Sequence, residues 1–130
     1  MRAYTVATVA ITLQVPTKWL DNILSHHKVP GVTQGRQGIA RRLTPEAVTV
    51  LEITLMLCRS LAIPAPRSLQ IATRLLLEGG ATARYSADDT LALVTNVEAI
   101  RADIARRLAD AVESAPRPRR GRPRALRAGD

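Results

Sequence analysis

The stretch that most constrains the fold is the long apolar run that follows Thr44-Pro45-Glu46. Thr44 is a preferred helix cap, Pro45 suits the first helical position, and Glu46 is favoured near the positive end of the helix dipole. Apolar residues then recur at helical spacing on one face: Val48, Leu51, Leu55 and Cys58. Further apolar residues widen this face: Val50, Ile53, Leu57 and Leu61. So broad an apolar surface predicts a central core helix, which the two prolines of segment 63–66 end.

Two short helices are predicted near the start of the chain. The first covers residues 6–13, is capped by Thr5 and carries its apolar face on Val6, Val9, Ala10 and Leu13. The second covers residues 17–27, begins after Pro16 and buries Trp19 or Leu20 together with Ile23 and Leu24. Because a few residues join the helices and the second has a polar outer face, the pair fits the helix-turn-helix pattern.

The following segments add a small amount of β structure and two more helices. Residues 29–43 contain two β-capable pieces separated by Gly35 to Gly38, which predicts a hairpin with Arg36 at its tip. A helix over 67–78 has an inward face of Leu69, Ala72, Leu75 and Leu76 and stops at Gly79-Gly80. A helix over 97–114 has an inward face of Val97, Ile100, Ile104, Leu108 and Ala111, with its charged residues, among them Arg101 and Arg107, mostly outside.

The segment between these helices has two interpretations. Residues 82–85 and 90–95 fit two strands joined by Ser86-Ala87-Asp88-Asp89, and they also fit one long helix capped by Ser86. We interpret Asp88-Asp89 as a turn rather than a cation site, because no third acidic residue lies near them in sequence. The sequence therefore predicts a mainly α fold with a small β-hairpin wing, with or without a further short β segment.

Charge points to a polyanionic partner. The chain has 19 Lys and Arg against 11 Asp and Glu, for a net charge of +8. Residues 1–80 hold nine basic and four acidic groups. Residues 81–115 hold four basic and six acidic groups, and residues 116–130 hold six basic groups and one acidic group. Two basic blocks around an acidic middle indicate contact with nucleic acid at two places. Because aromatic residues are only 2% of the chain, stacking on single strands is disfavoured and duplex DNA is expected.

The sequence shows no pattern typical of an enzyme or of a metal-binding protein. A single cysteine, Cys58, excludes a disulfide framework and a cysteine zinc cluster, and His26-His27 lack further metal ligands at a suitable spacing. No serine–histidine–aspartate arrangement, phosphate loop or dinucleotide fingerprint is visible. We therefore expect no enzyme activity, no cofactor and no metal. The sequence has no secretion signal or membrane span that we can identify, so a cytoplasmic, nucleoid-associated protein is expected.

The first 76 or so residues resemble the winged helix-turn-helix of MerR-type regulators and the related phage excisionases. The resemblance is carried by Val15-Pro16-Thr17, Val29-Pro30, Gly35-Arg36-Gln37, the run from Arg41 to Val48, and the apolar residues from Leu61-Ala62-Ile63 to Leu75-Leu76. The chain departs from the family pattern at Gln14, where a glycine is usual, and at Asp21-Asn22, where an arginine and an aromatic residue are common. The paired effector cysteines of the metal sensors have no counterpart here.

The resemblance implies a set of DNA-binding residues. The second helix would enter the major groove, with Thr17, Lys18, Asp21 and Asn22 as candidates for base contacts, while the wing would grip the flanking backbone through Arg36, Gln37, Arg41 and Arg42. A carboxylate facing phosphate is unfavourable, so we expect Asp21 to accept from a cytosine amine, to cap locally or to point away.

The end of the chain resembles an AT-hook. The core Arg120-Gly121-Arg122-Pro123 lies within Pro118–Arg124, in a tail that we expect to be disordered when free. In a hook, glycine lets the backbone approach the floor of a narrow minor groove and the flanking arginines run along it. The alternative is a tail that binds DNA through charge alone.

These observations predict three regions and one leading function. Residues 1–80 would form a winged helix-turn-helix domain, 81–115 a short β segment with a dimerisation or partner helix at 97–114, and 116–130 a disordered tail. The expected protein is a homodimeric, sequence-specific duplex-DNA-binding transcriptional regulator, whose effector and operator the sequence does not specify. Two alternatives remain: a protein-interaction adaptor or antitoxin-like partner, and an excisionase-like architectural recombination factor.

Overall fold

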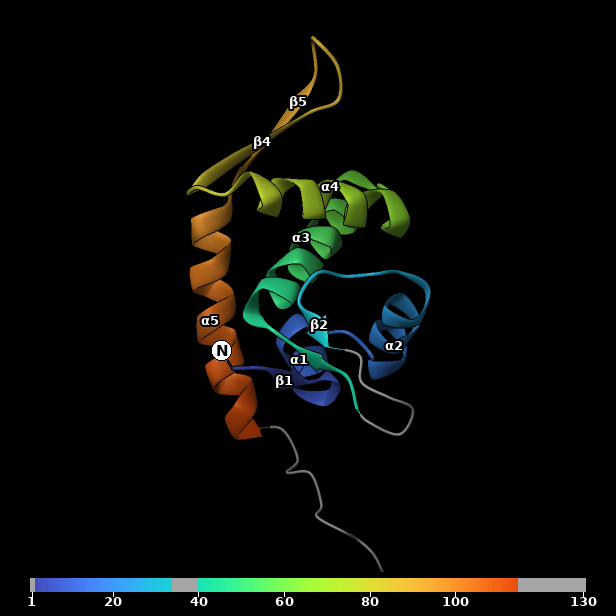
Figure 1. The fold of residues 1–130 in the computed structure, drawn as a ribbon, viewed down its shortest axis with the longest axis vertical. Helices are drawn as coiled ribbons and strands as arrows, with labels where there is room; N and C mark the ends of the chain where they lie inside the picture. Colours follow the sequence, from blue (N-terminus) through green and yellow to red (C-terminus); the bar gives the residue numbers. More distant parts are fainter. Residues whose placement is uncertain (1, 34–39, 115–130) are drawn as a thin grey trace, which may run out of the picture.

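The computed structural model describes residues 2–33 and 40–114, which form a mainly helical fold with two small antiparallel sheets (Figure 1). The elements run in the order β1 (Tyr4–Thr5), α1 (Val6–Leu13), α2 (Thr17–His26), β2 (Val32–Thr33), β3 (Arg42–Leu43), α3 (Pro45–Leu61), α4 (Ala65–Glu78), β4 (Thr82–Ser86), β5 (Ala92–Asn96) and α5 (Val97–Ser114). This confirms the expected mainly α fold with a hairpin.

The first two helices form as the sequence predicts. The Thr5 side chain caps α1 and accepts from the Thr8 N–H at 3.2 Å. The helix ends at Gln14, which adopts the left-handed conformation with φ of 57°. Glycine adopts this backbone geometry freely, whereas a residue with a side chain, such as Gln14, adopts it at the cost of some strain. Pro16 then precedes the first residue of α2.

A three-stranded antiparallel sheet lies beside these helices, in the order β1-β3-β2. Leu43 of β3 is opposite Tyr4 on one side and Val32 on the other, so the predicted pairing of the 29–33 and 40–43 segments is present. The sequence prediction missed β1, because two residues directly before a helix cap are too short for strand periodicity to show. Residues 34–39, the tip of the predicted hairpin, lie outside the described residues.

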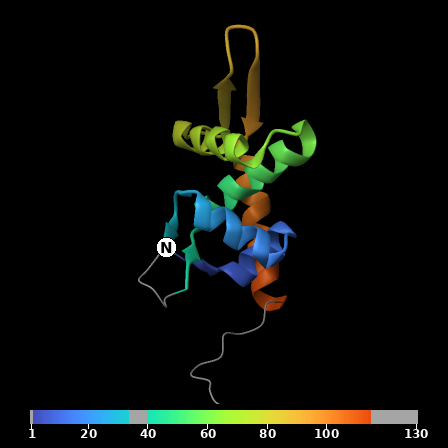
Figure 2. The same cartoon turned by 90° about the vertical axis from the view of Figure 1, so that its right-hand side faces the viewer.

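Helix α3 is the predicted central helix, and α1, α4 and α5 pack around it (Figures 1 and 2). Nearly every side chain from its first to its last full turn is buried: Ala47, Val48, Thr49, Val50, Leu51, Ile53, Thr54, Leu55 and Leu57. The expectation that Leu61 widens the core is wrong, because this last residue of α3 projects past its neighbours and is 54% exposed. Cys58 is half-buried, and its thiol donates to Ser68 Oγ at 3.6 Å.

Residues 82–96 form strands, and the alternative of one long helix is wrong. Strands β4 and β5 pair antiparallel from Thr82 opposite Asn96 to Ser86 opposite Ala92, and the hairpin projects beyond α4 (Figure 2). The Asp88 side chain organises the tip, since Oδ1 accepts from the backbone N–H of Thr90 at 2.7 Å and of Leu91 at 2.9 Å. These bonds, with one from the Thr90 hydroxyl, lower the pKa of Asp88 below its ordinary value.

Helix α5 packs its apolar face against α1 and α3 of the same chain. Val97, Ile104, Leu108 and Ala111 are buried and Ile100 is half-buried, as the helical spacing predicts. The expectation that Arg107 lies outside is wrong, because its guanidinium turns inward to Glu52 of α3 at 2.9 Å. The homodimer predicted through residues 97–114 stays a prediction, and the inward apolar face is already occupied within the chain.

Candidate nucleic-acid interface

The outer face of α2 gathers the four residues that the sequence predicts for base contacts. Thr17, Lys18, Asp21 and Asn22 are all exposed, and positions three and four residues apart, such as Lys18 with Asp21 and with Asn22, are neighbours on a helix surface. The opposite side of α2 is fixed in the core by its buried residues Leu20, Ile23 and Leu24. The helix is therefore anchored on its apolar side and presents a continuous polar side to solvent, free of bulky apolar groups.

Arg41, which directly precedes β3, contacts this face of α2. Its Nη2 donates to Ser25 Oγ at 3.2 Å, and its Nη1 lies 3.8 Å from Asp21 Oδ1. Asp21 therefore faces a guanidinium of its own molecule, which removes the conflict that a free carboxylate would have with phosphate. Because the Asp21 side chain is 53% exposed and the contact is long, the pair contributes at most about 1 kcal/mol, and Arg41 can exchange it for a stronger anion.

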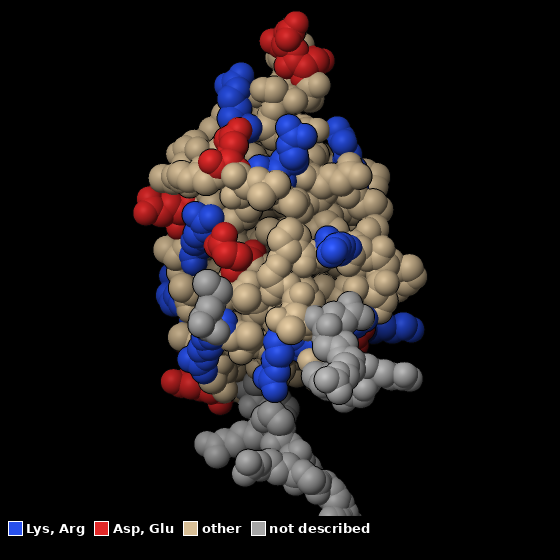
Figure 3. All heavy atoms as spheres, viewed as in Figure 1, with Lys and Arg blue, Asp and Glu red and all other residues tan. Residues whose placement is uncertain are grey.

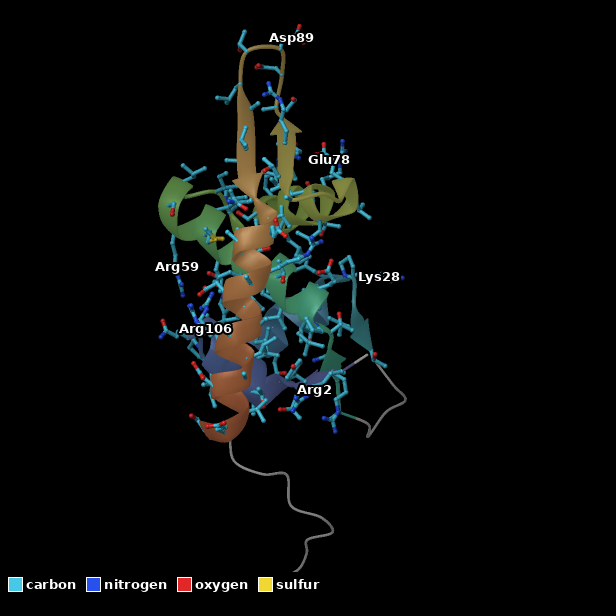
Figure 4. The ribbon with its side chains drawn as sticks, turned by 90° about the vertical axis from the view of Figure 1, so that its left-hand side faces the viewer. Arg2, Lys28, Arg59, Glu78, Asp89 and Arg106 are labelled. Atoms are coloured by element: carbon cyan, nitrogen blue, oxygen red, sulfur yellow. The ribbon has the colours of Figure 1, made fainter. Side chains whose placement is uncertain are left out.

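Arg42 lies on the small sheet, directly after Arg41 in the chain. Strand side chains alternate, and since Leu43 is fully buried, Arg42 is exposed on the outer side of β3, opposite Thr33 and Thr5. Arg2, which the sequence analysis did not single out, precedes β1, and its guanidinium carbon lies 5.1 Å from the ring centroid of Tyr4 (Figure 4). A two-residue strand gave no signal that would have placed Arg2 at the edge of the small sheet.

Six of the predicted contact residues lie outside the described part of the chain. Arg36 and Gln37 belong to segment 34–39, and the AT-hook-like core belongs to segment 115–130: Arg120, Gly121, Arg122 and Pro123. The structure therefore brings Arg41 to the α2 face and leaves Arg42 exposed on β3, while the hairpin tip and the tail stay predictions.

The charges on the face shown in Figure 3 are mixed on the α5 side. Acidic side chains lie on that side and at the β4–β5 tip, and basic side chains lie on both the α5 side and the α4 side. On the α5 side, ion pairs neutralise the arginines: Arg101 with Glu46 at 2.9 Å, Arg107 with Glu52, and Arg106 with Asp103. Within the described ranges, Lys18 and Arg42 make no ion pair, so their charges remain available to a partner.

The two histidines at the end of α2 lie beside this interface. Nδ1 of His26 is 2.8 Å from the carbonyl oxygen of Asn22, so the ring donates to the last turn of the helix.

Among residues 2–33 and 40–114 there is no group of three metal-ligating side chains close enough to hold a metal ion. No helix in those same ranges has the length and apolar character needed to cross a membrane.

Comparisons with protein-family models, with curated proteins and with solved structures returned no match for this chain.

Proposed function

We propose that the protein is a winged helix-turn-helix regulator that binds duplex DNA with sequence preference. The observation that carries the proposal is the exposed polar face of α2, anchored from behind by Leu20, Ile23 and Leu24 and contacted at its edge by Arg41. An α-helix with its side chains is about 10–12 Å in diameter, so the 10-residue α2 fits a major groove about 12 Å wide. Arg41, at the edge of this face, would then lie where the groove is bordered by phosphates.

Each side chain on this face has a role consistent with its chemistry. Asn22 is suited to a two-point contact with adenine, and Lys18 to guanine or to phosphate. Arg42 is suited to the backbone, as is Arg41 once it leaves Asp21. The homodimer and the hook-like tail belong to the same proposal: a dimer would repeat the contacts about 34 Å along the duplex, and the tail would add minor-groove or charge contacts.

A salt-dependent DNA titration tests the proposal. Affinity should fall steeply with salt, and Lys18→Gln and Arg42→Gln should each lower the logarithmic salt slope by up to about one unit. Arg59→Gln is the matched control, because Arg59 is exposed on α3 and lies on the opposite side of the molecule from Lys28 (Figure 4). An affinity that hardly changes with salt, or an equal effect of all three variants, contradicts the proposed interface.

Base reading is tested separately by selection from a random duplex library. The wild-type chain should enrich a defined sequence, and Asn22→Ala should relax the choice at one or two positions, each worth about 1–3 kcal/mol. If the wild-type chain enriches no sequence, the regulator proposal fails and an architectural DNA-binding role of the excisionase kind replaces it. In that case the chain should bend DNA regardless of sequence.

One observation favours a second function, that of a protein-interaction adaptor. A hollow of about 390 Å³ lies between α3, β5 and the start of α5, and its lining includes the exposed side chains of Met56, Leu61 and Val94. Exposed apolar side chains that cluster in this way are typical of interaction surfaces. This function predicts a stoichiometric protein partner that survives high salt and nuclease and that is lost on Leu61→Ser. Loss of the same partner on nuclease treatment contradicts it.

A further inference from the structure

The candidate DNA interface does not include a second basic feature, a hollow of about 540 Å³ between the end of α2, the outer side of α4 and strand β4. Its lining includes Lys28, Arg67, Arg74, Gln70 and Tyr85. The volume falls within the range of pockets that bind small molecules. The three basic residues come from two segments far apart in sequence, so the fold, rather than a local charge run, brings them together.

The hollow is positively charged and contains no acidic group. None of its lining residues is Asp or Glu, and within the described ranges Lys28, Arg67 and Arg74 make no ion pair. On the α5 side, by contrast, Arg101, Arg106 and Arg107 each have a carboxylate partner. The arginines of α5 are therefore neutralised by acidic partners, whereas the basic side chains around the hollow are not.

Neutral acceptors hold Arg67 in a fixed position. Its Nη2 donates to the Tyr85 hydroxyl at 2.7 Å and its Nη1 to Gln70 Oε1 at 3.1 Å. Its guanidinium carbon also lies 5.8 Å from the centroid of the Tyr85 ring. Because these partners carry no charge, the guanidinium is oriented without being neutralised, and its remaining N–H groups are free to bind an anion.

We propose that this hollow, formed by Lys28, Arg67 and Arg74, binds a phosphate group. Guanidinium groups match phosphate oxygens in a planar, two-point geometry, and an ammonium group adds a compact charge from the facing segment. The buried side chain of Leu69 and the Tyr85 ring, which also line the hollow, provide an apolar wall for the organic part of a phosphomonoester. The phosphate can belong to a free small molecule or to a DNA backbone, and the proposal does not depend on DNA binding.

A bound phosphate would join two parts of the molecule. Lys28 follows the last residue of α2 closely, whereas Arg67 and Arg74 belong to α4. An anion held between them therefore restrains the end of α2, the helix that carries the candidate base contacts. A free phosphorylated ligand in this hollow would thus be in a position to alter DNA binding.

Calorimetric titration of the full chain in a low-salt chloride buffer tests the proposal, with inorganic phosphate and adenosine 5′-monophosphate as the two probes. The wild-type chain should bind at least one probe, and Lys28→Gln and Arg74→Gln should each weaken that binding about tenfold. The control Arg59→Gln removes the same charge on the opposite side of the molecule and should change it less than about twofold. Thermal unfolding of each variant shows that it is folded. Arg67 is not substituted, because it also holds Tyr85.

Duplex DNA titrated in the same buffer distinguishes the two sources of phosphate. Probe binding that needs Lys28 and Arg74, with DNA affinity unchanged in both variants, assigns the hollow to a free phosphorylated molecule. DNA affinity that falls in both variants but not in Arg59→Gln, without probe binding, assigns it to the backbone. If Lys28→Gln and Arg74→Gln behave like Arg59→Gln with every probe, the proposal is overturned, and this outcome leaves the α2 interface untouched.

Discussion

Nη2 of Arg107 lies 2.9 Å from Oε2 of Glu52, so a single ion pair joins the middle of α5 to the middle of α3. The same guanidinium donates through Nη1 to the carbonyl oxygen of Thr12, in the last turn of α1, at 3.0 Å. Arg107 therefore contacts three helices at once and satisfies a carbonyl at a helix end. Its side chain is 26% exposed and that of Glu52 is 16% exposed, so solvent screens this pair less than the surface pairs of α5.

Glu52→Gln should destabilise the protein, because it removes the ion pair that joins the half-buried Arg107 guanidinium to α3 and leaves only Asp103 of α5 as its charged partner. We expect the free energy of unfolding to fall by about 1–2 kcal/mol, measured by urea denaturation. The control is Arg106→Gln, whose side chain is 70% exposed and pairs only with Asp103, and it should change stability by less than about 0.5 kcal/mol. Equal effects of the two variants would show that the Arg107 contact contributes nothing beyond surface charge.

The residue that caps α3 leaves no room for a side chain at Gly31. Its φ is +86°, and a Cβ built there would lie 2.3 Å from Oγ1 of Thr44, the residue that caps α3 and donates its N–H to the Gly31 carbonyl. Gly31→Ala should therefore lower the free energy of unfolding by about 2–4 kcal/mol, through backbone strain and loss of the cap. Gly80→Ala shares the positive φ, but the nearest atom is 3.9 Å from its Cβ, so it should cost only about 1 kcal/mol. Thermal or urea unfolding compares the two.

The tip of the β4–β5 hairpin should respond to acid through Asp88. Hydrogen bonds from Thr90 and Leu91 lower the pKa of this carboxylate in the folded chain. Its contribution to hairpin stability is therefore complete above its ordinary pKa of about 3.9 and is lost as the pH falls through the lower folded value. Amide resonances of Thr90 and Leu91 should follow that titration, and Asp88→Asn should abolish it. Asp89→Asn should leave it unchanged, and if it does not, Asp88 is not the titrating group.

The sequence predicts the elements of this fold better than it predicts contacts between distant residues. The cap at Thr44 predicts where α3 begins, and the apolar pattern predicts that the helix is buried. Both predictions succeed because both signals are local in the chain. The inward turn of Arg107 depends on Glu52, which is far away in sequence, and helical spacing alone places it at the edge of the charged face. The same reason hides the contact between Arg41 and Asp21 and the assembly of Lys28 with Arg67.

Two polar residues of α1 are buried, although polarity in a sequence usually indicates exposure. Thr8 and Thr12 are buried on α1, and the Thr12 hydroxyl donates to the Thr8 carbonyl at 3.0 Å. This local bond satisfies the Thr12 hydroxyl within its own helix, and the Thr8 hydroxyl accepts from that of Thr5 at 3.1 Å. A threonine can therefore take a core position that a sequence pattern assigns to solvent. Of the candidate interface, the polar side of α2, with Ser25, was predictable from amphipathic spacing, whereas the contact of Arg41 with Ser25 appears only once the chain is folded.

Removing residues 116–130 should weaken DNA binding, because the segment holds six arginines and one acidic residue. The logarithmic salt slope should become shallower as the phosphate contacts of the tail are lost. If the Arg120-Gly121-Arg122-Pro123 core binds as a hook, the loss should be larger on AT-rich than on GC-rich duplexes of equal length. An equal loss on both leaves a tail that binds through charge alone, and no loss on either contradicts any role of the segment in DNA binding.

Asp21→Asn should strengthen DNA binding, since it removes the carboxylate on the α2 face and releases Arg41 from its partner 3.8 Å away. We expect affinity for non-specific duplex to rise several-fold and the logarithmic salt slope to steepen by up to about one unit. Glu113→Gln is the matched control, because it removes one exposed carboxylate from α5, and it should change affinity less than about twofold. A gain that is the same in both variants reflects net charge alone, whereas weaker binding by Asp21→Asn means that Asp21 reads a base directly.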